Sequence, residues 1–276
     1  MNTQAGVAGP RPAVSVHGLR KTYGSGDTAV HALADISFTV DPGDFVAVVG
    51  PSGAGKTTLL QCLSGLLPPT AGEVSIFGDP VRGPMESLAL VFQDYSRSLF
   101  PWLTARGNVE LPLRSRGLAK SEVDERTGSS LAAVDLSGHH DKYPWQMSGG
   151  MQQRVAIARA LALRPRVLLM DEPFASVDAQ TRFDLEDLVL TVWSEIDVTV
   201  LFVTHDIDEA VYLSSHVKVL SLPPTVVASE MVVPLARPRH QVTTREDPQF
   251  GHLRAELFRR VMGLRAESAA RSAQDT

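Results

Sequence analysis

The chain has 276 residues, 43% hydrophobic and 21% charged, which fits one large globular domain or a domain with an embedded subdomain. Its net charge of −5 gives no global basic field of the kind that recruits nucleic acid, so we expect no nucleic-acid partner. No stretch approaches the roughly 18–20 apolar residues that a membrane-spanning helix needs, so any membrane role must come through a partner.

Short strands are predicted in the first third of the chain, on the basis of alternating or continuous apolar runs. They cover residues 14–16, 36–40, 45–49, 73–77 and 88–92. The run 45–49 is apolar throughout, as expected for a strand buried on both faces of a parallel sheet. A helix is predicted over residues 57–66, and its Cys62 is the only cysteine in the chain. An intrachain disulfide is therefore excluded, and we expect a buried, inert thiol.

Residues from about 95 to 160 change character, because helical patterns replace strands. Helices are expected around residues 105–114, 121–134 and 150–163, before strands resume at 166–170 and 198–203. We interpret this as a helical subdomain of about residues 95–160 inserted into an α/β core. Residues 1–12 and 265–276 lack apolar periodicity and are expected to be flexible tails, which leaves a domain at 13–264.

A phosphate-binding loop follows the third strand. Residues 50–57 match the pattern G-x-x-x-x-G-K-[ST] between a buried strand and a helix. The backbone N–H groups of such a loop point at the phosphates of a nucleoside triphosphate, and the helix N-terminus adds its positive end. Lys56 would place its charge between the β- and γ-phosphates, Thr57 would offer a hydroxyl to Mg²⁺, and Thr58 could reach the α-phosphate. The rest of the predicted cradle is Gly50, Pro51, Ser52, Gly53, Ala54 and Gly55. The alternative is a chance glycine-rich loop.

Polar side chains end three of the predicted strands. Asp171 and Glu172 close the apolar run 167–170, where a carboxylate is costly unless it has a cationic partner. In P-loop ATPases that arrangement places Asp171 in the Mg²⁺ shell and Glu172 beside the attacking water as general base. His205, after the strand 198–203, could contact the γ-phosphate, and Gln93 could contact both Mg²⁺ and the attacking water. The alternatives are a surface turn, a structural histidine and a polar strand-end residue.

Two further segments could touch a nucleotide. The ring of Tyr23 lies a suitable distance before the loop to stack on adenine, unless it is a packing tyrosine. Ser148-Gly149-Gly150 opens an amphipathic helix, and Ser148 is a plausible N-cap. Two glycines each cost a helix roughly 1 kcal/mol relative to Ala, so something else must require them. Close approach of bare backbone to a phosphate would do so.

Three features together resemble the motifs of ATP-binding-cassette (ABC) ATPases, and the resemblance covers roughly residues 14–263. They are the phosphate loop, the pair Asp171-Glu172 and the segment Met147-Ser148-Gly149-Gly150-Met151-Gln152-Gln153-Arg154. The resemblance implies an α/β P-loop NTPase core with a mixed sheet and helices, an antiparallel β subdomain and an inserted α-helical subdomain. It implies hydrolysis of ATP with Mg²⁺ in a head-to-tail homodimer, whose interface is isologous. Ser148, Gly149 and Gly150 would then cap the ATP of the opposite subunit, and Asp178 would end the loop that links the two sites.

Within that family the chain resembles the ATPase subunits of nitrate, sulfonate and taurine importers of bacteria. The resemblance rests on Leu99-Phe100-Pro101-Trp102-Leu103, on the segment Asp178-Ala179-Gln180-Thr181-Arg182 after the acidic pair, and on Arg237-Pro238-Arg239 before a short C-terminal helix. Phe100 is an unusual neighbour within the first of these segments, and Val177 departs mildly from the Ala-Leu-Asp that the wider family more often has before the second. Leu99, Phe100 and Trp102 could dock the permease in a groove beside the helical subdomain, or could simply pack its core.

The resemblance also implies partners and a location. We expect a second copy of the chain, separate transmembrane permease subunits and, indirectly, an extracytoplasmic solute-binding protein, with this chain peripheral on the cytoplasmic side of the cell membrane. The same motifs would serve an exporter or a lipid-extracting ATPase. A soluble ABC ATPase acting on ribosomes or DNA is a further alternative, but such proteins usually carry a second cassette or a long coiled coil, which this chain lacks.

Overall fold

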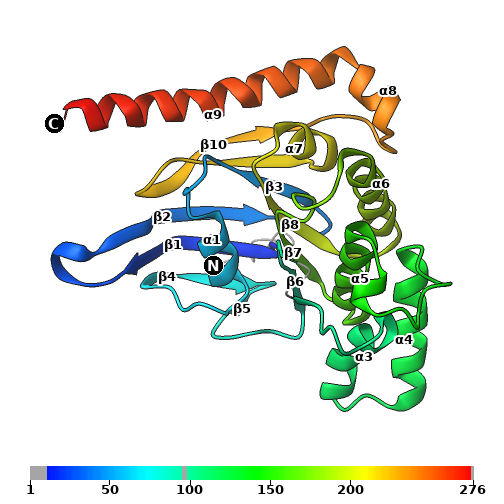
Figure 1. The fold of residues 1–276 in the computed structure, drawn as a ribbon. Helices are drawn as coiled ribbons and strands as arrows, with labels where there is room; N and C mark the ends of the chain where they lie inside the picture. Colours follow the sequence, from blue (N-terminus) through cyan, green and yellow to red (C-terminus); the bar gives the residue numbers. More distant parts are fainter. Residues whose placement is uncertain (1–10, 95–97, 275–276) are drawn as a thin grey trace, which may run out of the picture.

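A ten-stranded sheet organises residues 11–94 and 98–274, the part of the chain that this computed structural model describes (Figure 1). The strand order is β5-β4-β1-β2-β10-β9-β3-β8-β7-β6. The strands are β1 Val14–Tyr23, β2 Val30–Val40, β3 Phe45–Val49, β4 Ala71–Ile76, β5 Asp79–Pro80, β6 Leu88–Val91, β7 Val167–Asp171, β8 Thr199–Thr204, β9 His216–Leu220 and β10 Thr225–Val232.

The sheet has a parallel half and an antiparallel half. Strands β9, β3, β8, β7 and β6 pair in parallel, and β3, β7 and β8 are buried along their whole length. Their continuous apolar runs are explained by this two-sided burial. Strands β5, β4, β1 and β2 pair antiparallel, and their residues alternate more between buried and exposed. The predicted mixed sheet with an antiparallel β subdomain is confirmed.

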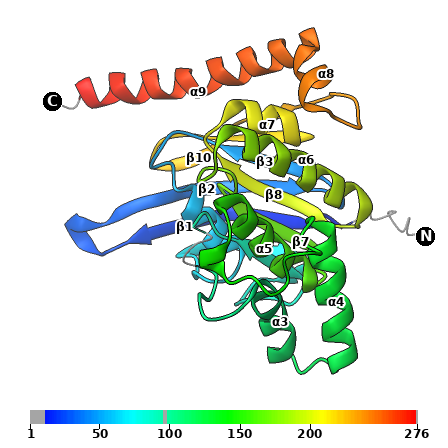
Figure 2. The same cartoon turned by 45° about the vertical axis from the view of Figure 1, so that its right-hand side comes forward.

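Helices cover the parallel half and form a separate group beside it. They are α1 Lys56–Leu63, α3 Ala105–Ser115, α4 Lys120–Ala133, α5 Gly149–Ala162, α6 Ala179–Glu195, α7 Ile207–Leu213, α8 Gln241–Glu246 and α9 Pro248–Gln274, with short 3-10 turns at Gly26–Thr28 and Pro144–Gln146. The chain leaves the sheet after β6, forms α3, α4 and α5, which pack on one another, and returns at β7 (Figure 2). The inserted helical subdomain is therefore present.

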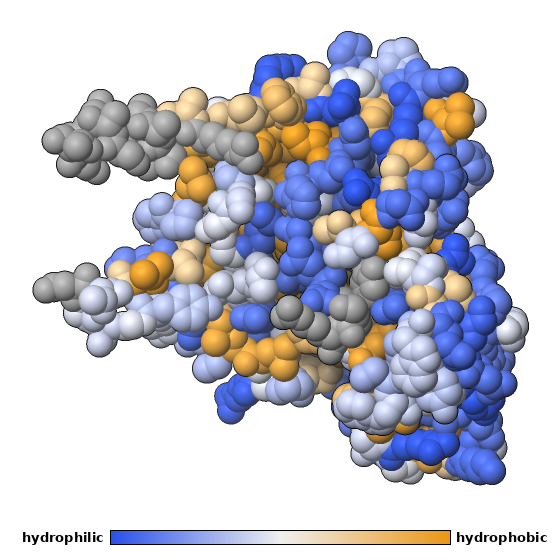
Figure 3. Space-filling model, viewed as in Figure 1, coloured by the Kyte–Doolittle hydropathy of each residue, from blue (hydrophilic) through white to orange (hydrophobic). Residues whose placement is uncertain are grey.

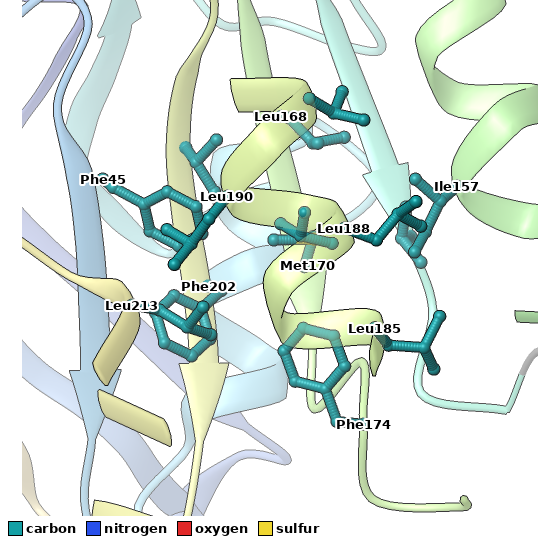
Figure 4. Packing of buried hydrophobic residues seen from close by; sticks show 14 of the residues in the cluster. Phe45, Ile157, Leu168, Met170, Phe174, Leu185, Leu188, Leu190, Phe202 and Leu213 are labelled. Carbon is teal, nitrogen blue, oxygen red and sulfur yellow. The ribbon is translucent and has the colours of Figure 1, made fainter. Parts of the chain in front are cut away.

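The main core lies between the parallel strands and helices α5 and α6 (Figure 4). Phe45 and Phe202 meet edge to face there, with ring centroids 5.5 Å apart, and Met170 and Phe174 continue the same layer. Cys62 is buried in a second cluster on the other side of the sheet, where desolvation raises its pKa. The expected inert thiol fits this environment, since a raised pKa disfavours the reactive thiolate.

The C-terminal segment differs from the expected tail. The helix α9 continues to Gln274, although residues 265–276 were expected to be a flexible tail after residue 264. Residues 265–274 are rich in alanine and in other good helix formers, so they can extend a helix without apolar periodicity. Apolar residues gather along and beneath α9 (Figure 3), where Leu257 is buried and Phe258 is 52% exposed. The expected N-terminal tail, residues 1–12, lies outside the described residues except for Arg11 and Pro12.

The helix α1 is shorter than predicted. The helix predicted to reach residue 66 ends at Leu63, because Gly65 turns the backbone to φ +73°. Glycine is needed at this position, since a side chain on residue 65 would meet the Gly83 carbonyl oxygen at 2.2 Å.

Among residues 11–94 and 98–274, no helix combines the length and the apolar character needed to cross a bilayer.

Candidate functional site

Most of the predicted site residues line one cavity of about 750 Å³, near the carboxyl ends of β3, β7 and β8. The predicted residues that line it are Tyr23, Gly50, Ser52, Gly53, Ala54, Gly55, Lys56, Thr57, Thr58, Gln93, Glu172 and His205. The carboxyl edge of parallel strands is where α/β proteins bind ligands. Two other predicted residues lie just behind this lining: Pro51 is buried in the loop, and Asp171 ends β7.

The loop at the start of α1 is shaped to hold phosphate groups. Gly53 and Gly55 adopt φ of +81° and +68°, which glycine adopts readily, and the Ala54 N–H between them donates to the Pro51 carbonyl at 3.1 Å, so the loop curls tightly before α1. Gly55 is also the N-cap of α1 and provides no side-chain cap for the first turn. Lys56 is buried, and its Nζ donates to the carbonyl oxygens of Gly50 and Pro51 at 3.0 and 3.1 Å. A polyanion fits this loop, because it would be met by a cation, N–H donors and a helix N-terminus.

The carboxyl group of Asp171 has features expected of a metal ligand. It is 6% exposed, and its Oδ1 has no hydrogen-bond partner among the described atoms. Desolvation raises its pKa, while the Thr57 hydroxyl and the charge of Lys56 oppose that rise. A buried carboxylate oxygen without a partner is costly, and a divalent cation would satisfy it. Mg²⁺ fits because it takes one or two protein oxygens and completes its shell with water and phosphate oxygens.

Three residues predicted to be catalytic meet at one oxygen atom. Glu172 Oε2 lies 3.1 Å from Gln93 Nε2, which donates to it, and 3.0 Å from His205 Nδ1. The backbone of Glu172 is left-handed, at φ +42°, and its N–H donates to the Val203 carbonyl at 2.9 Å. A non-glycine residue in this region is strained, and such strain concentrates at functional sites. The side chains of Gln93, Glu172 and His205 therefore form one hydrogen-bonded group at the cavity wall.

The ring of Tyr23 forms the far wall of the cavity, on the antiparallel half of the sheet. Tyr23 is 41% exposed, and its hydroxyl lies 3.2 Å from Thr58 Oγ1. The Nζ of Lys21 stands 5.5 Å from the ring centroid. The Thr58 hydroxyl, which we expected to be directed at an α-phosphate, is thus already engaged. The exposed ring is available for stacking on a base.

Ser148, Gly149, Gly150 and Asp178 do not line this cavity. Ser148 caps α5 by accepting a hydrogen bond from Met151 N at 3.3 Å, and Asp178 caps α6 by accepting from Thr181 N at 3.0 Å. A Cβ atom on Gly150 would lie 2.3 Å from Thr181 Cγ2. Packing of α5 against α6 within the chain is therefore one reason for Gly150 that the sequence did not reveal.

Several apolar residues of the cavity wall were not predicted. They are Val30, Ala32, Val49, Ile207 and Val261. Val30 lies opposite Tyr23 in the β1–β2 ladder, and Val261 comes from α9, more than 200 residues further along the chain. Val49 and Ile207 lie within two positions of the predicted residues Gly50 and His205. The pairing of β1 with β2 brings Val30 and Ala32 to the site, and the packing of α9 brings Val261.

The segment before α3 divides into a buried and an exposed part. Leu99 is 3% exposed and belongs to the main core, as the packing alternative predicts. Trp102 is 69% exposed, and its ring is tilted against that of Phe100 at a centroid distance of 5.4 Å. Core packing therefore accounts for Leu99 but not for Trp102. The preceding residues 95–97 lie outside the described residues.

Comparison with known proteins supports the motif analysis. Residues 33–175 match the family model described as "ABC transporter". The chain is 42% identical to the nitrate import ATP-binding protein NrtD of Synechococcus elongatus, over 83% of this chain and 85% of that protein. It is also 42% identical to the taurine import ATP-binding protein TauB of Chromobacterium violaceum, over 86% and 92%. A dimeric ATP-binding cassette in a post-hydrolysis state with ADP and Pi superposes with a TM-score of 0.70 at 33% identity, covering 80% of this chain and 98% of that one.

Proposed function

Because the chain belongs to the ABC transporter family of ATPases, we propose that it binds ATP in the cavity between Tyr23 and the phosphate loop and powers import through a separate permease. The observation that carries this proposal is the meeting of Gln93, Glu172 and His205 beside that loop. Residues 13–264 would form the ATPase domain, with residues 95–160 as its helical subdomain.

The side chains divide the work of hydrolysis. The loop N–H groups and Lys56 hold the β- and γ-phosphates, and the ring of Tyr23 stacks on adenine. Glu172 takes a proton from the attacking water as general base, and the amide of Gln93 orients its carboxylate. His205, on the other side of that carboxylate, is placed to contact the γ-phosphate. Thr58, bonded to Tyr23, would support the ring or turn to the α-phosphate.

Thr57 and Asp171, with Gln93 at the cavity wall, are the residues that would hold Mg²⁺. When bound there, Mg²⁺ neutralises charge on the phosphate oxygens. Among the described residues, no group of three His, Cys, Asp or Glu side chains could hold a metal ion by itself. The protein would thus supply part of the coordination shell and the nucleotide the rest.

Ser148, Gly149, Gly150 and Asp178 act, in this proposal, on a second copy of the chain. They lie outside the chain's own cavity, and a cassette of similar structure is a dimer in its post-hydrolysis state. Two copies would close head to tail, so that the N-terminus of α5 meets the ATP of the partner. Hydrolysis would then let the pair reopen.

The permease is proposed to dock near Trp102. A tryptophan that is 69% exposed at the entry to the helical subdomain offers the kind of aromatic anchor found at interfaces. The relatives named above import nitrate and taurine, so we propose a small anionic or zwitterionic solute delivered by an extracytoplasmic binding protein. The chain would sit on the cytoplasmic face of the membrane.

Affinity purification tests the proposal. Tagged Glu172→Gln protein would be isolated from native membranes with ATP and Mg²⁺, and co-purifying proteins identified by mass spectrometry. Recovery of a multi-spanning permease supports it, and a Trp102→Ala version should lose the permease while still binding ATP. Recovery of ribosomal or DNA-repair proteins with no membrane protein would overturn it. Lys56→Met serves as the control that cannot hold ATP.

A further inference from the structure

One buried hydroxyl holds the backbone on both sides of His205. Thr204, the last residue of β8, is 1% exposed, and its Oγ1 accepts a hydrogen bond from Asp206 N at 3.0 Å. The same hydroxyl donates to Glu209 Oε2 at 2.6 Å. Asp206 in turn caps α7, accepting from the N–H groups of Asp208 and Glu209 at 2.8 and 3.2 Å. The turn that carries His205 is therefore fixed to the first turn of α7 through Thr204 and Glu209.

The burial of Glu209 calls for an explanation. An acid in the first turn of a helix can act from the surface, and Asp208 beside it is partly exposed. Glu209 is 4% exposed and lies near two further carboxylates, Asp206 and Glu186. Burying a carboxylate among other carboxylates is unfavourable, so helix stability alone does not account for its place.

The cation that faces Glu209 comes from α6. Arg182 Nε lies 3.7 Å from Glu209 Oε1, an ion-pair distance too long for a hydrogen bond, and Arg182 Nη1 donates to Asp206 Oδ2 at 3.3 Å. Arg182 belongs to the first turn of α6, and its N–H donates to the Asp178 carbonyl at 2.9 Å. The loop that ends at Asp178 and the turn that carries His205 are thus joined through Arg182.

His205 depends on this framework for its direction. Its side chain is 63% exposed, and the contact that orients the imidazole is the one to Glu172, at 3.0 Å. We propose that Glu209 is a positioning residue for ATP hydrolysis: through the Thr204 hydroxyl it holds the His205 imidazole beside Glu172, and through Arg182 it couples that imidazole to the Asp178 loop. This inference rests on the proposed role of His205 in the ATPase site.

Steady-state ATPase kinetics on the full chain test the inference. Glu209→Leu removes the acceptor and should lower kcat about tenfold with little change in KM, since small misplacements of catalytic groups are costly. Glu209→Gln keeps an oxygen that can accept from Thr204 and should recover most of kcat. Thr204→Val should lower kcat like Glu209→Leu, and Thr204→Ser should restore it. The matched control is Thr199→Val on the same strand, which removes a buried hydroxyl bonded to Gly43 N at 3.0 Å.

A double-mutant cycle separates positioning from stability. In a His205→Ala background, Thr204→Val should change the remaining rate by less than about twofold, because its effect passes through His205. Equal loss in both backgrounds, or unchanged kcat for Thr204→Val and Glu209→Leu, would overturn the inference. If the Glu209→Leu variant does not fold, the kcat of Thr204→Val decides whether the inference holds.

A second readout does not need turnover. The imidazole resonance of His205, assigned by its loss in His205→Ala, should shift in Thr204→Val and stay in place in Thr199→Val. An unchanged resonance in Thr204→Val would overturn the inference. If the unaltered chain does not hydrolyse ATP, the proposed function fails. The same NMR comparison, with Glu209→Leu beside Thr204→Val, still decides whether Glu209 and Thr204 position His205.

Discussion

Nδ1 of His205 lies 3.0 Å from Oε2 of Glu172, although 33 positions separate the two residues. The contact exists because β7 and β8 are parallel neighbours, so residues that follow them emerge at the same edge of the sheet. Gln93, which follows the next strand, β6, reaches the same oxygen at 3.1 Å. The order of three strands in the sheet thus assembles the proposed catalytic group.

The Glu172→Gln variant should separate binding from hydrolysis. Replacing the carboxylate by an amide removes the proposed base but keeps the side chain between Gln93 and His205, so ATPase activity should fall at least about 100-fold. Affinity for ATP should stay close to that of the unaltered chain. Phosphate release and the binding of a fluorescent ATP analogue would measure the two quantities. Hydrolysis within a few fold of normal would contradict the role of Glu172.

Tyr23 should contribute through its ring rather than its hydroxyl. Tyr23→Ala removes the exposed ring and should weaken ATP binding about tenfold, the scale of one base–aromatic stack. Tyr23→Phe loses only the 3.2 Å contact to Thr58 Oγ1 and should bind nearly as tightly. Titration calorimetry with ATP would compare them. Equal weakening in both variants would place the contribution in the hydroxyl instead.

Two properties of the fold could require glycine at position 150, namely packing against Thr181 and close approach to a partner's phosphates. One pair of variants distinguishes them. Gly150→Ala places a Cβ 2.3 Å from Thr181 Cγ2 and should destabilise the fold by about 1–3 kcal/mol, the usual cost of overpacking. Thr181→Ser removes that methyl but keeps the hydroxyl that donates to Asp178 Oδ2 at 2.7 Å. The double variant should recover the melting temperature. It should still fail to form an ATP-dependent dimer if the partner's phosphates need bare backbone, whereas recovery of both properties would contradict that need.

Glu209 should make stability depend on pH. Its pKa is raised from 4.5 to about 7, first by desolvation, and then by Asp206 and Glu186. Between these pH values the folded chain holds a proton that the unfolded chain releases, so the contribution to the free energy of unfolding is complete below pH 4.5 and is lost as the pH rises through about 7. The free energy of unfolding that this proton contributes therefore falls by about 3 kcal/mol between pH 4.5 and about pH 7.

The Glu209→Gln variant removes this titration. Its melting temperature relative to that of the unaltered chain should therefore rise between about pH 5 and about pH 8. Thermal melts of both proteins at both pH values measure the effect. A difference in melting temperature that is the same at both pH values would show that Glu209 does not titrate as proposed. Asp208→Asn, on the partly exposed neighbouring acid, is the control.

The sequence predicted the parts of the site that depend on local pattern. The buried strand Phe45–Val49, the glycine loop and the helix after it are adjacent in the chain, so their geometry follows from residues 45–63 alone. The sequence also predicted the placement of Glu172 and His205, because each comes directly after a strongly apolar strand.

Features set by distant packing were not predicted. Glu209 reads as an ordinary first-turn acid of α7, and its burial arises only when α6 brings Arg182 and Glu186 against it. The close approach of Gly150 to Thr181, which a Cβ atom would make too tight, depends on how α5 meets α6. Val261 joins the cavity wall because α9 crosses back over the sheet, and nothing near it in the sequence carries that information.

The division of site residues between two surfaces has a genetic consequence. Lys56 lines the cavity, whereas Ser148 lies outside it at the start of α5. Under the proposed head-to-tail arrangement, a chain with Lys56→Met and a chain with Ser148→Arg are each inactive alone. A mixed pair places both defects in one composite site and leaves the other with an unaltered Lys56 and an unaltered Ser148. Two null alleles expressed together would then complement each other.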